Sequence, residues 1–164
     1  MAVTVIALTA LVSSMLASAR LHRTSSETAV AQRAAAQLLE RLQGLPFDEI
    51  FASYNSDAGD DGGLSAPAAG PNFAVPALDA LATDADGLCG EVSFPTFDNA
   101  GVLELREDVV DAALGLPRDL DLDGAIDALD HSGDYRLLPV RISIRWRGVD
   151  GERAIRLETV LCER

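Results

Sequence analysis

The first 45 residues constrain the fold most, because they predict one unusually long helix. Residues 1–19 contain no charge, proline or glycine. From Ser25 onward, apolar residues recur every three or four positions, as on one face of a helix, at Val30, Ala34, Leu38, Leu42 and Leu45. Gly44 and Pro46 supply a stop signal. A helix of about 44 residues would be about 65 Å long, and few globular folds contain such a rod.

The two halves of this rod differ in character. An uncharged run of about 19 residues is at the lower limit for spanning a bilayer, so we expect a membrane-spanning first half and an amphipathic second half. A cleavable secretory signal is the alternative interpretation, since small residues occur in "SMLASA". It is disfavoured because no basic segment precedes the apolar run and the helical pattern continues past these small residues.

The overall charge limits the classes of partner. The chain has a formal net charge of -13, from 13 arginines against 26 carboxylates, with no lysine. A nucleic-acid backbone attracts basic surfaces, so nucleic acid is excluded as a partner. Cations are the expected ligands of so acidic a chain.

The remainder of the chain predicts a small α+β domain, so we divide the chain into a helix over 1–45 and a domain over 46–164. Residues 55–72, rich in Asp, Gly, Ser and Pro, predict a surface loop. Short strands are expected within 90–97 and 101–105, and a short helix over 106–117. The clearest strands form a C-terminal antiparallel hairpin over 135–162, with a turn at Asp150 and Gly151. The expected fold is thus a long helix packed on a small antiparallel sheet.

An acidic run, "DLDLDGAIDALD", occupies residues 119–130 and matches an EF-hand-type calcium loop. Such a loop needs oxygen ligands at positions 1, 3, 5, 7, 9 and 12, a glycine at 6 and an apolar residue at 8. Gly124 and Ile126 fill the last two roles, the isoleucine being expected to pin the loop to the core. The predicted Ca²⁺ ligands are Asp119, Asp121, Asp123, Ala125 through its carbonyl, Asp127 and Asp130.

Some details of the calcium prediction stay open. The twelfth residue is Asp130 rather than the longer bidentate Glu, so it would bind through one oxygen or a water molecule. Asp134 is a candidate extra ligand. Dockerin loops also end in Asp, but they occur as pairs flanked by helices, whereas here one loop precedes strands. Mg²⁺ fits less well because it resists dehydration, and a solvated surface turn without a cation is the alternative.

Two cysteines, Cys89 and Cys162, show no spacing typical of zinc. A single disulfide and two unpaired thiols are equally compatible with the sequence. We expect no enzymatic activity, because no nucleophile arrangement can be recognised around His131 or Ser132.

Residues 1–50 carry a family resemblance. The segments "MAVTVIALTALVSSMLASARL" and "AVAQRAAAQLLERLQGLPFDEI" resemble the type IV pilins and pseudopilins, in particular the minor pilins grouped as type IV pilus modification proteins. Family members begin with a basic leader, a glycine and a glutamate, and "MAVTVIAL" resembles the residues that follow these, so the leader is expected to be missing from this sequence.

The resemblance implies a function. A subunit of a type IV pilus or type II secretion-like filament would pack through its N-terminal helix against other pilin subunits, after contact with inner-membrane lipid. Its location would be single-pass in the inner membrane with a periplasmic domain, or in an extracellular filament. Calcium would rigidify the domain. The alternative is a membrane-anchored or secreted calcium-binding module that does not assemble.

Overall fold

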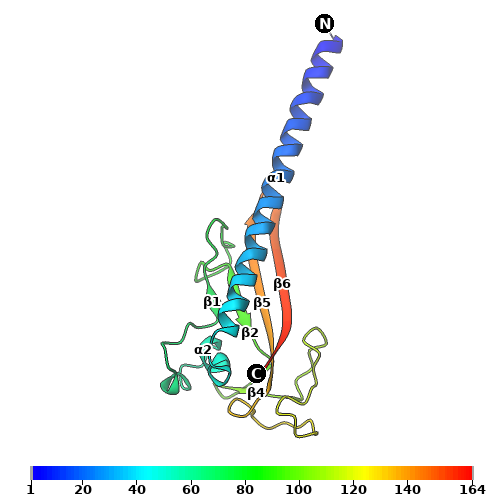
Figure 1. Cartoon of the computed structure of the whole chain (residues 1–164). Helices are drawn as coiled ribbons and strands as arrows, with labels where there is room; N and C mark the ends of the chain where they lie inside the picture. The colour runs from blue at the N-terminus through cyan, green and yellow to red at the C-terminus, as the bar shows by residue number, and fades with distance from the viewer. Residues whose placement is uncertain (1, 164) are drawn as a thin grey trace.

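The computed structural model describes residues 2–163, and the side chains of residues 10–163. Its dominant element is α1 (Ala2–Gln43), a single helix of 42 residues that ends just before Gly44. At 1.5 Å per residue its length is about 63 Å. Figure 1 shows the first half of α1 projecting away from the domain, while its second half lies against the sheet. Residues 10–23, called the stem below, are all exposed.

The prediction of a membrane-spanning half needs correction. In the part of the chain whose side chains are described, no helix is long and apolar enough to cross a membrane. There, the uncharged residues 10–19 are followed by Arg20 and Arg23, and ten residues rise only about 15 Å, half of a bilayer core. The expected transmembrane half and the expected single-pass location in the inner membrane are therefore contradicted. Residues 1–9 of the expected span lie outside the described side chains.

The second half of α1 packs on the domain through small residues and leucines. Ala31, Ala35, Leu38 and Leu42 are buried, each 5% exposed or less. Val30 and Ala34, predicted to face the sheet, are only partly buried. The buried face is thus rotated by about one residue from the predicted one. Alanine at two of the four contact positions lets the helix approach the sheet closely.

The sheet beneath α1 has four antiparallel strands in the order β1-β2-β5-β6. They are β1 (Asn72–Phe73), β2 (Gly90–Ser93), β5 (Leu137–Gly148) and β6 (Gly151–Cys162). β3 (Thr96–Asn99) and β4 (Val102–Leu105) form a separate hairpin. A helix packed on an antiparallel sheet is compatible with the α+β class.

The C-terminal hairpin matches its prediction closely. β5 and β6 pair along their full lengths, from Leu137 opposite Cys162 to Gly148 opposite Gly151. The loop is therefore Val149 and Asp150, one residue earlier than the predicted turn, and Gly151 adopts φ 125°, which favours glycine. The predicted alternation is confirmed, because the side chains of β5 that face α1 are buried, namely Val140, Ile142, Ile144 and Trp146.

Two other segments differ from their predictions. Between α1 and β1 the chain forms η1 (Phe47–Glu49), α2 (Ile50–Tyr54) and η2 (Asp61–Gly63), none of which was predicted. Residues 106–117, predicted as a short helix, form turns instead. The backbone N–H groups of Ala113 and Leu114 donate to Oδ1 of Asp111, and such local bonds compete with a helix.

The two cysteines are free, so the disulfide alternative is excluded. Cys89 accepts a backbone hydrogen bond from Arg145 near one end of β5, whereas Cys162 lies opposite Leu137 at the other end. Eight residues of β5 separate these points, about 26 Å at 3.3 Å per residue. A disulfide requires Cα atoms within about 7 Å.

A polar contact marks the place where the stem meets the domain. Glu27 of α1 is 9% exposed, and its Oε2 accepts a hydrogen bond of 3.3 Å from Nε1 of the buried Trp146. Its Oε1 accepts a 2.9 Å bond from Nε of Arg23. A buried carboxylate with a specific donor can occupy only one position along the sheet, so this contact fixes the register of α1 on β5.

Candidate cation site

The acidic loop, residues 119–130, lies at the end of the domain farthest from the stem (Figure 1). Carboxylates and one histidine gather there. In three overlapping triplets, one potential ligand atom from each residue lies within 4.8 Å of the other two. Glu107, Asp121 and His131 each belong to two of the triplets. We call the whole group the acid site. It comprises Glu107, Asp119, Asp121, Asp127, His131 and Asp134.

Glu107 is the centre of the acid site, although sequence reasoning gave it no role. It follows β4 and is only 1% exposed. Its Oε1 accepts hydrogen bonds from the backbone N–H groups of Leu120 and, at 3.4 Å, Asp121. Its Oε2 accepts a 3.1 Å bond from the N–H of Asp127. One buried carboxylate thus holds both ends of the acidic loop, and no sequence signal distinguishes it from its neighbour Asp108.

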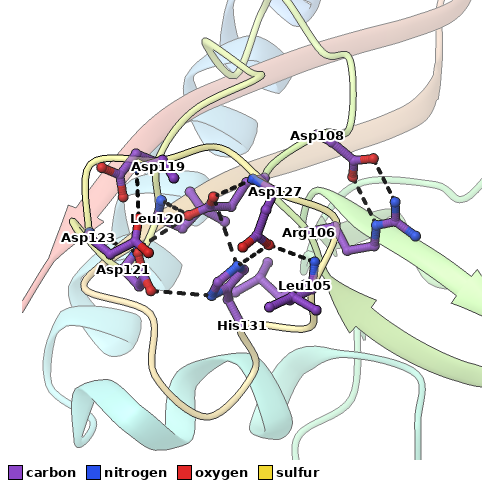
Figure 2. Close-up of polar contacts among 12 residues, drawn as sticks. Leu105, Arg106, Asp108, Asp119, Leu120, Asp121, Asp123, Asp127 and His131 are labelled. Carbon is purple, nitrogen blue, oxygen red and sulfur yellow. Dashed lines mark hydrogen bonds and ion pairs between the residues drawn. The ribbon is translucent and has the colours of Figure 1, made fainter.

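His131 directly follows the loop and is 4% exposed, with its Nε2 3.9 Å from Oε2 of Glu107. Its Nε2 is 3.3 Å from Oδ1 of Asp127 and its Nδ1 is 3.1 Å from Oδ1 of Asp134. Figure 2 shows the ring between Asp121 and Asp127. Burial disfavours the imidazolium, but the hydrogen bonds to Asp127 and Asp134 and the charge of Glu107 outweigh it, so the pKa of His131 is raised above its usual value.

The structure brings together three of the six predicted ligands. Asp119 and Asp121 form a triplet with Glu107, and Asp127 forms one with Glu107 and His131. Asp134, the candidate extra ligand, groups with Asp121 and His131.

Two of the other predicted ligands, Asp123 and Asp130, belong to none of the triplets found among the described side chains. The triplets consist of carboxylate and imidazole groups alone, so they do not bear on the backbone carbonyl predicted at Ala125. Oδ1 of Asp123 accepts a 2.7 Å bond from the N–H of Ala125. The carboxylate of Asp130 instead accepts bonds from the N–H of Leu105 and from both the N–H and the hydroxyl of Ser132. Asp130 therefore ties the loop to the end of β4 rather than facing Asp119.

The loop has the predicted sharp turn at its sixth position, but the residue that anchors it to the core is not the predicted one. Gly124 has φ 94°, the conformation for which glycine is needed at the sixth position. Its N–H donates to Oδ2 of Asp119 at 2.9 Å. Ile126, expected to pin the loop to the core, is 53% exposed, whereas Leu120 is fully buried. The leucine and the carboxylate of Glu107 perform the anchoring expected of the isoleucine.

This arrangement suits a hard or borderline divalent cation. Oxygen atoms bound to one Ca²⁺ at 2.3–2.6 Å lie within about 5 Å of one another, and the triplet of Glu107, Asp119 and Asp121 meets that condition. A cation there would relieve the repulsion among carboxylates held this close.

Comparisons of the chain with protein-family models, with curated proteins and with solved structures found no match.

Proposed function

We propose that this chain is a non-enzymatic structural subunit of a pilin-like filament, in which the stems of neighbouring copies pack against one another. The observation that carries the proposal is the exposure of the stem's large apolar side chains. Leu11, Val12, Met15, Leu16 and Leu21 are between 48% and 71% exposed. Exposed apolar clusters of this kind mark interaction surfaces in soluble proteins.

The pattern of the stem suits contact with other helices. Leu11 and Met15 lie four residues apart, as do Val12 and Leu16, so each pair forms a ridge along the helix. The residues between and after these pairs, 13–14 and 17–19, are all serines or alanines, whose small side chains leave grooves that ridges of a neighbouring helix can enter. The resemblance of residues 1–50 to pilins supports the same mode of packing.

We also propose that the acid site binds Ca²⁺ and that the ion stiffens the end of the domain. Glu107, Asp119 and Asp121 offer oxygens close enough to share one ion. The ligands come from two segments, the turn after β4 and the loop before β5. An ion bound between them would hold the β3–β4 hairpin against the main sheet.

Sedimentation velocity of the full chain tests the assembly proposal. Met15→Glu/Leu16→Glu places two charges in the ridges, and we expect it to convert large assemblies into small species. Ala36→Glu/Gln37→Glu is the matched control, because it adds the same charges at exposed positions of the same helix beside the domain. We expect the control to assemble like the unmodified chain.

Equal sedimentation of the unmodified chain and the stem variant would refute the assembly proposal. If Ca²⁺ binding persisted in that case, the chain would be a calcium-binding module that does not assemble.

Titration calorimetry with CaCl₂ tests the cation proposal. Asp121→Asn is the cleanest variant, since an amide oxygen can still accept the 3.0 Å bond from the N–H of Asp123 while the ligand charge is lost. We expect Ca²⁺ affinity to fall about tenfold or more, because affinity in such loops follows ligand charge. Glu40→Gln, an exposed change on α1, should bind like the unmodified chain. Absence of Ca²⁺ binding at millimolar concentration would refute the proposal.

A further inference from the structure

The outer edge of β6 lacks a partner strand. β6 is the last strand in the order β1-β2-β5-β6, and β5 is its only pairing partner among residues 2–163. The edge is 12 residues long and contains no proline. Natural proteins usually shorten or interrupt such edges, because their free N–H and C=O groups recruit another strand.

The hairpin determines which backbone groups point outward. Gly148 and Gly151 close the two-residue loop, so they form a hydrogen-bonded pair, and bonded pairs then alternate along the ladder. Pro139, which has no N–H, lies opposite Val160 in a pair that is not hydrogen-bonded, so the ladder between β5 and β6 does not require a donor there. The residues of β6 whose backbone groups face outward are therefore Glu152, Ala154, Arg156, Glu158, Val160 and Cys162.

We propose that β6 pairs antiparallel with β6 of a second copy of this chain, about a two-fold axis at Leu157. Charge selects this register. With Leu157 opposite itself, Arg156 lies opposite Glu158 on both sides of the axis, and every outward-facing residue has a partner. Moving the axis by one residue in either direction would place Arg156 opposite Arg156 or Glu158 opposite Glu158. Opposite charges across strands stabilise a pair, and like charges destabilise it.

The side chains that would form these pairs are available. Arg156 is exposed and makes no ion pair among the described side chains. Glu158 is bonded to Nε of Arg141 through Oε1 at 2.9 Å, which leaves its Oε2 for the second copy. At the axis, two Leu157 side chains would meet on the face that carries α1.

A groove at the end of β6 adds a further complementary contact. It has a volume of about 680 Å³ and lies between the end of α1 and four consecutive residues of β6 and its extension, 160–163. Consecutive residues alternate between faces, so the strand contributes its edge to the groove. In the proposed register Arg153 of the second copy lies opposite Leu161, beside two acids that line the groove, Asp48 and Glu163.

This contact is separate from the stem packing proposed above. A two-fold axis perpendicular to the sheet makes the two stems point in opposite directions, whereas stems in a filament run together. The experiment therefore uses Met15→Glu/Leu16→Glu as the background, so that failure of one proposal leaves the other unaffected.

Disulfide crosslinking tests the register. In the non-hydrogen-bonded pair at the axis, the two Leu157 Cα atoms would be about 4.5 Å apart, within disulfide range. Leu157→Cys, with Cys162→Ser to remove the exposed thiol, should give a covalent dimer under mild oxidation. Thr159→Cys in the same background is the matched control. Its two copies would lie about 13 Å apart along the strands and should stay unlinked. Equal crosslinking of both variants, or of neither, overturns the proposal.

Charge reversal tests the pairing without cysteines. Arg156→Glu should weaken the dimer about tenfold or more in sedimentation equilibrium, because it creates two pairs of like charges. Arg156→Glu/Glu158→Arg restores opposite charges and should recover dimerisation. A chain that is monomeric without any of these changes, or an Arg156→Glu variant that dimerises normally, overturns self-pairing.

Discussion

Glu107→Gln should destabilise the domain far more than its position in a turn suggests. The carboxylate is 1% exposed and accepts backbone hydrogen bonds at both oxygens. Glutamine retains one acceptor, but its NH₂ group must face either the N–H of Leu120 or that of Asp127. At least one charge-assisted bond is lost and one buried donor is left without an acceptor. The lost charge-assisted bond costs about 1.5–3 kcal/mol and the unpaired donor about 1–3 kcal/mol, so we expect a total loss of about 2.5–6 kcal/mol.

Urea unfolding with a calcium chelator present measures this loss, because added Ca²⁺ would contribute a separate binding term. Asp108→Asn is the matched control. Asp108 is the next residue, and its solvent-screened ion pair with Arg106 should contribute little to stability. Equal unfolding midpoints for Glu107→Gln and Asp108→Asn would refute the view that Glu107 organises the loop.

Three further predictions concern the core and its edges. Burial raises the pKa of Tyr135 to about 12, so about 2–3 kcal/mol of stability, present below pH 10, should disappear as the pH rises to 12; Tyr135→Phe should flatten this part of the pH profile. Gly90→Ala would place a Cβ in steric overlap with the ring of Phe73, and urea unfolding should show a loss of about 1–3 kcal/mol. Trp146→Phe removes the Nε1 donor to Glu27 and should cost about 1–3 kcal/mol in urea unfolding; an unchanged midpoint would show that this bond does not hold α1.

The long helix and the C-terminal hairpin could be predicted because their signals are local and repeated. Leucines at helical spacing and alternating residues such as Ile142 and Ile144 identify the element and its buried face without knowledge of the rest of the chain. The buried face of α1 was predicted about one residue away from its true position, because alanine is only weakly hydrophobic and contributes little to a periodic pattern. Ala31 and Ala35 are buried for their small size, which matters only once the sheet is in place.

The acid site was predicted only in part, because its central residue, Glu107, lies outside the acidic loop in the sequence. The spacing of Asp119, Asp121 and Gly124 is visible within a few residues, and the turn forms as expected. Glu107 contacts the loop only because folding places the end of β4 beside it. Asp130 points away from the loop because its carboxylate accepts a hydrogen bond from the N–H of Leu105. Neither preference can be read from a window of sequence. The same holds for Cys89 and Cys162, whose separation is set by the length of β5.

The contact between stems is the central claim, and electron microscopy of the concentrated full chain in negative stain tests it most directly. The account predicts elongated filaments with domains along their surface, which disappear in Met15→Glu/Leu16→Glu and persist in Ala36→Glu/Gln37→Glu. Uniform single particles from the unmodified chain, or filaments that the stem variant forms equally well, would contradict it.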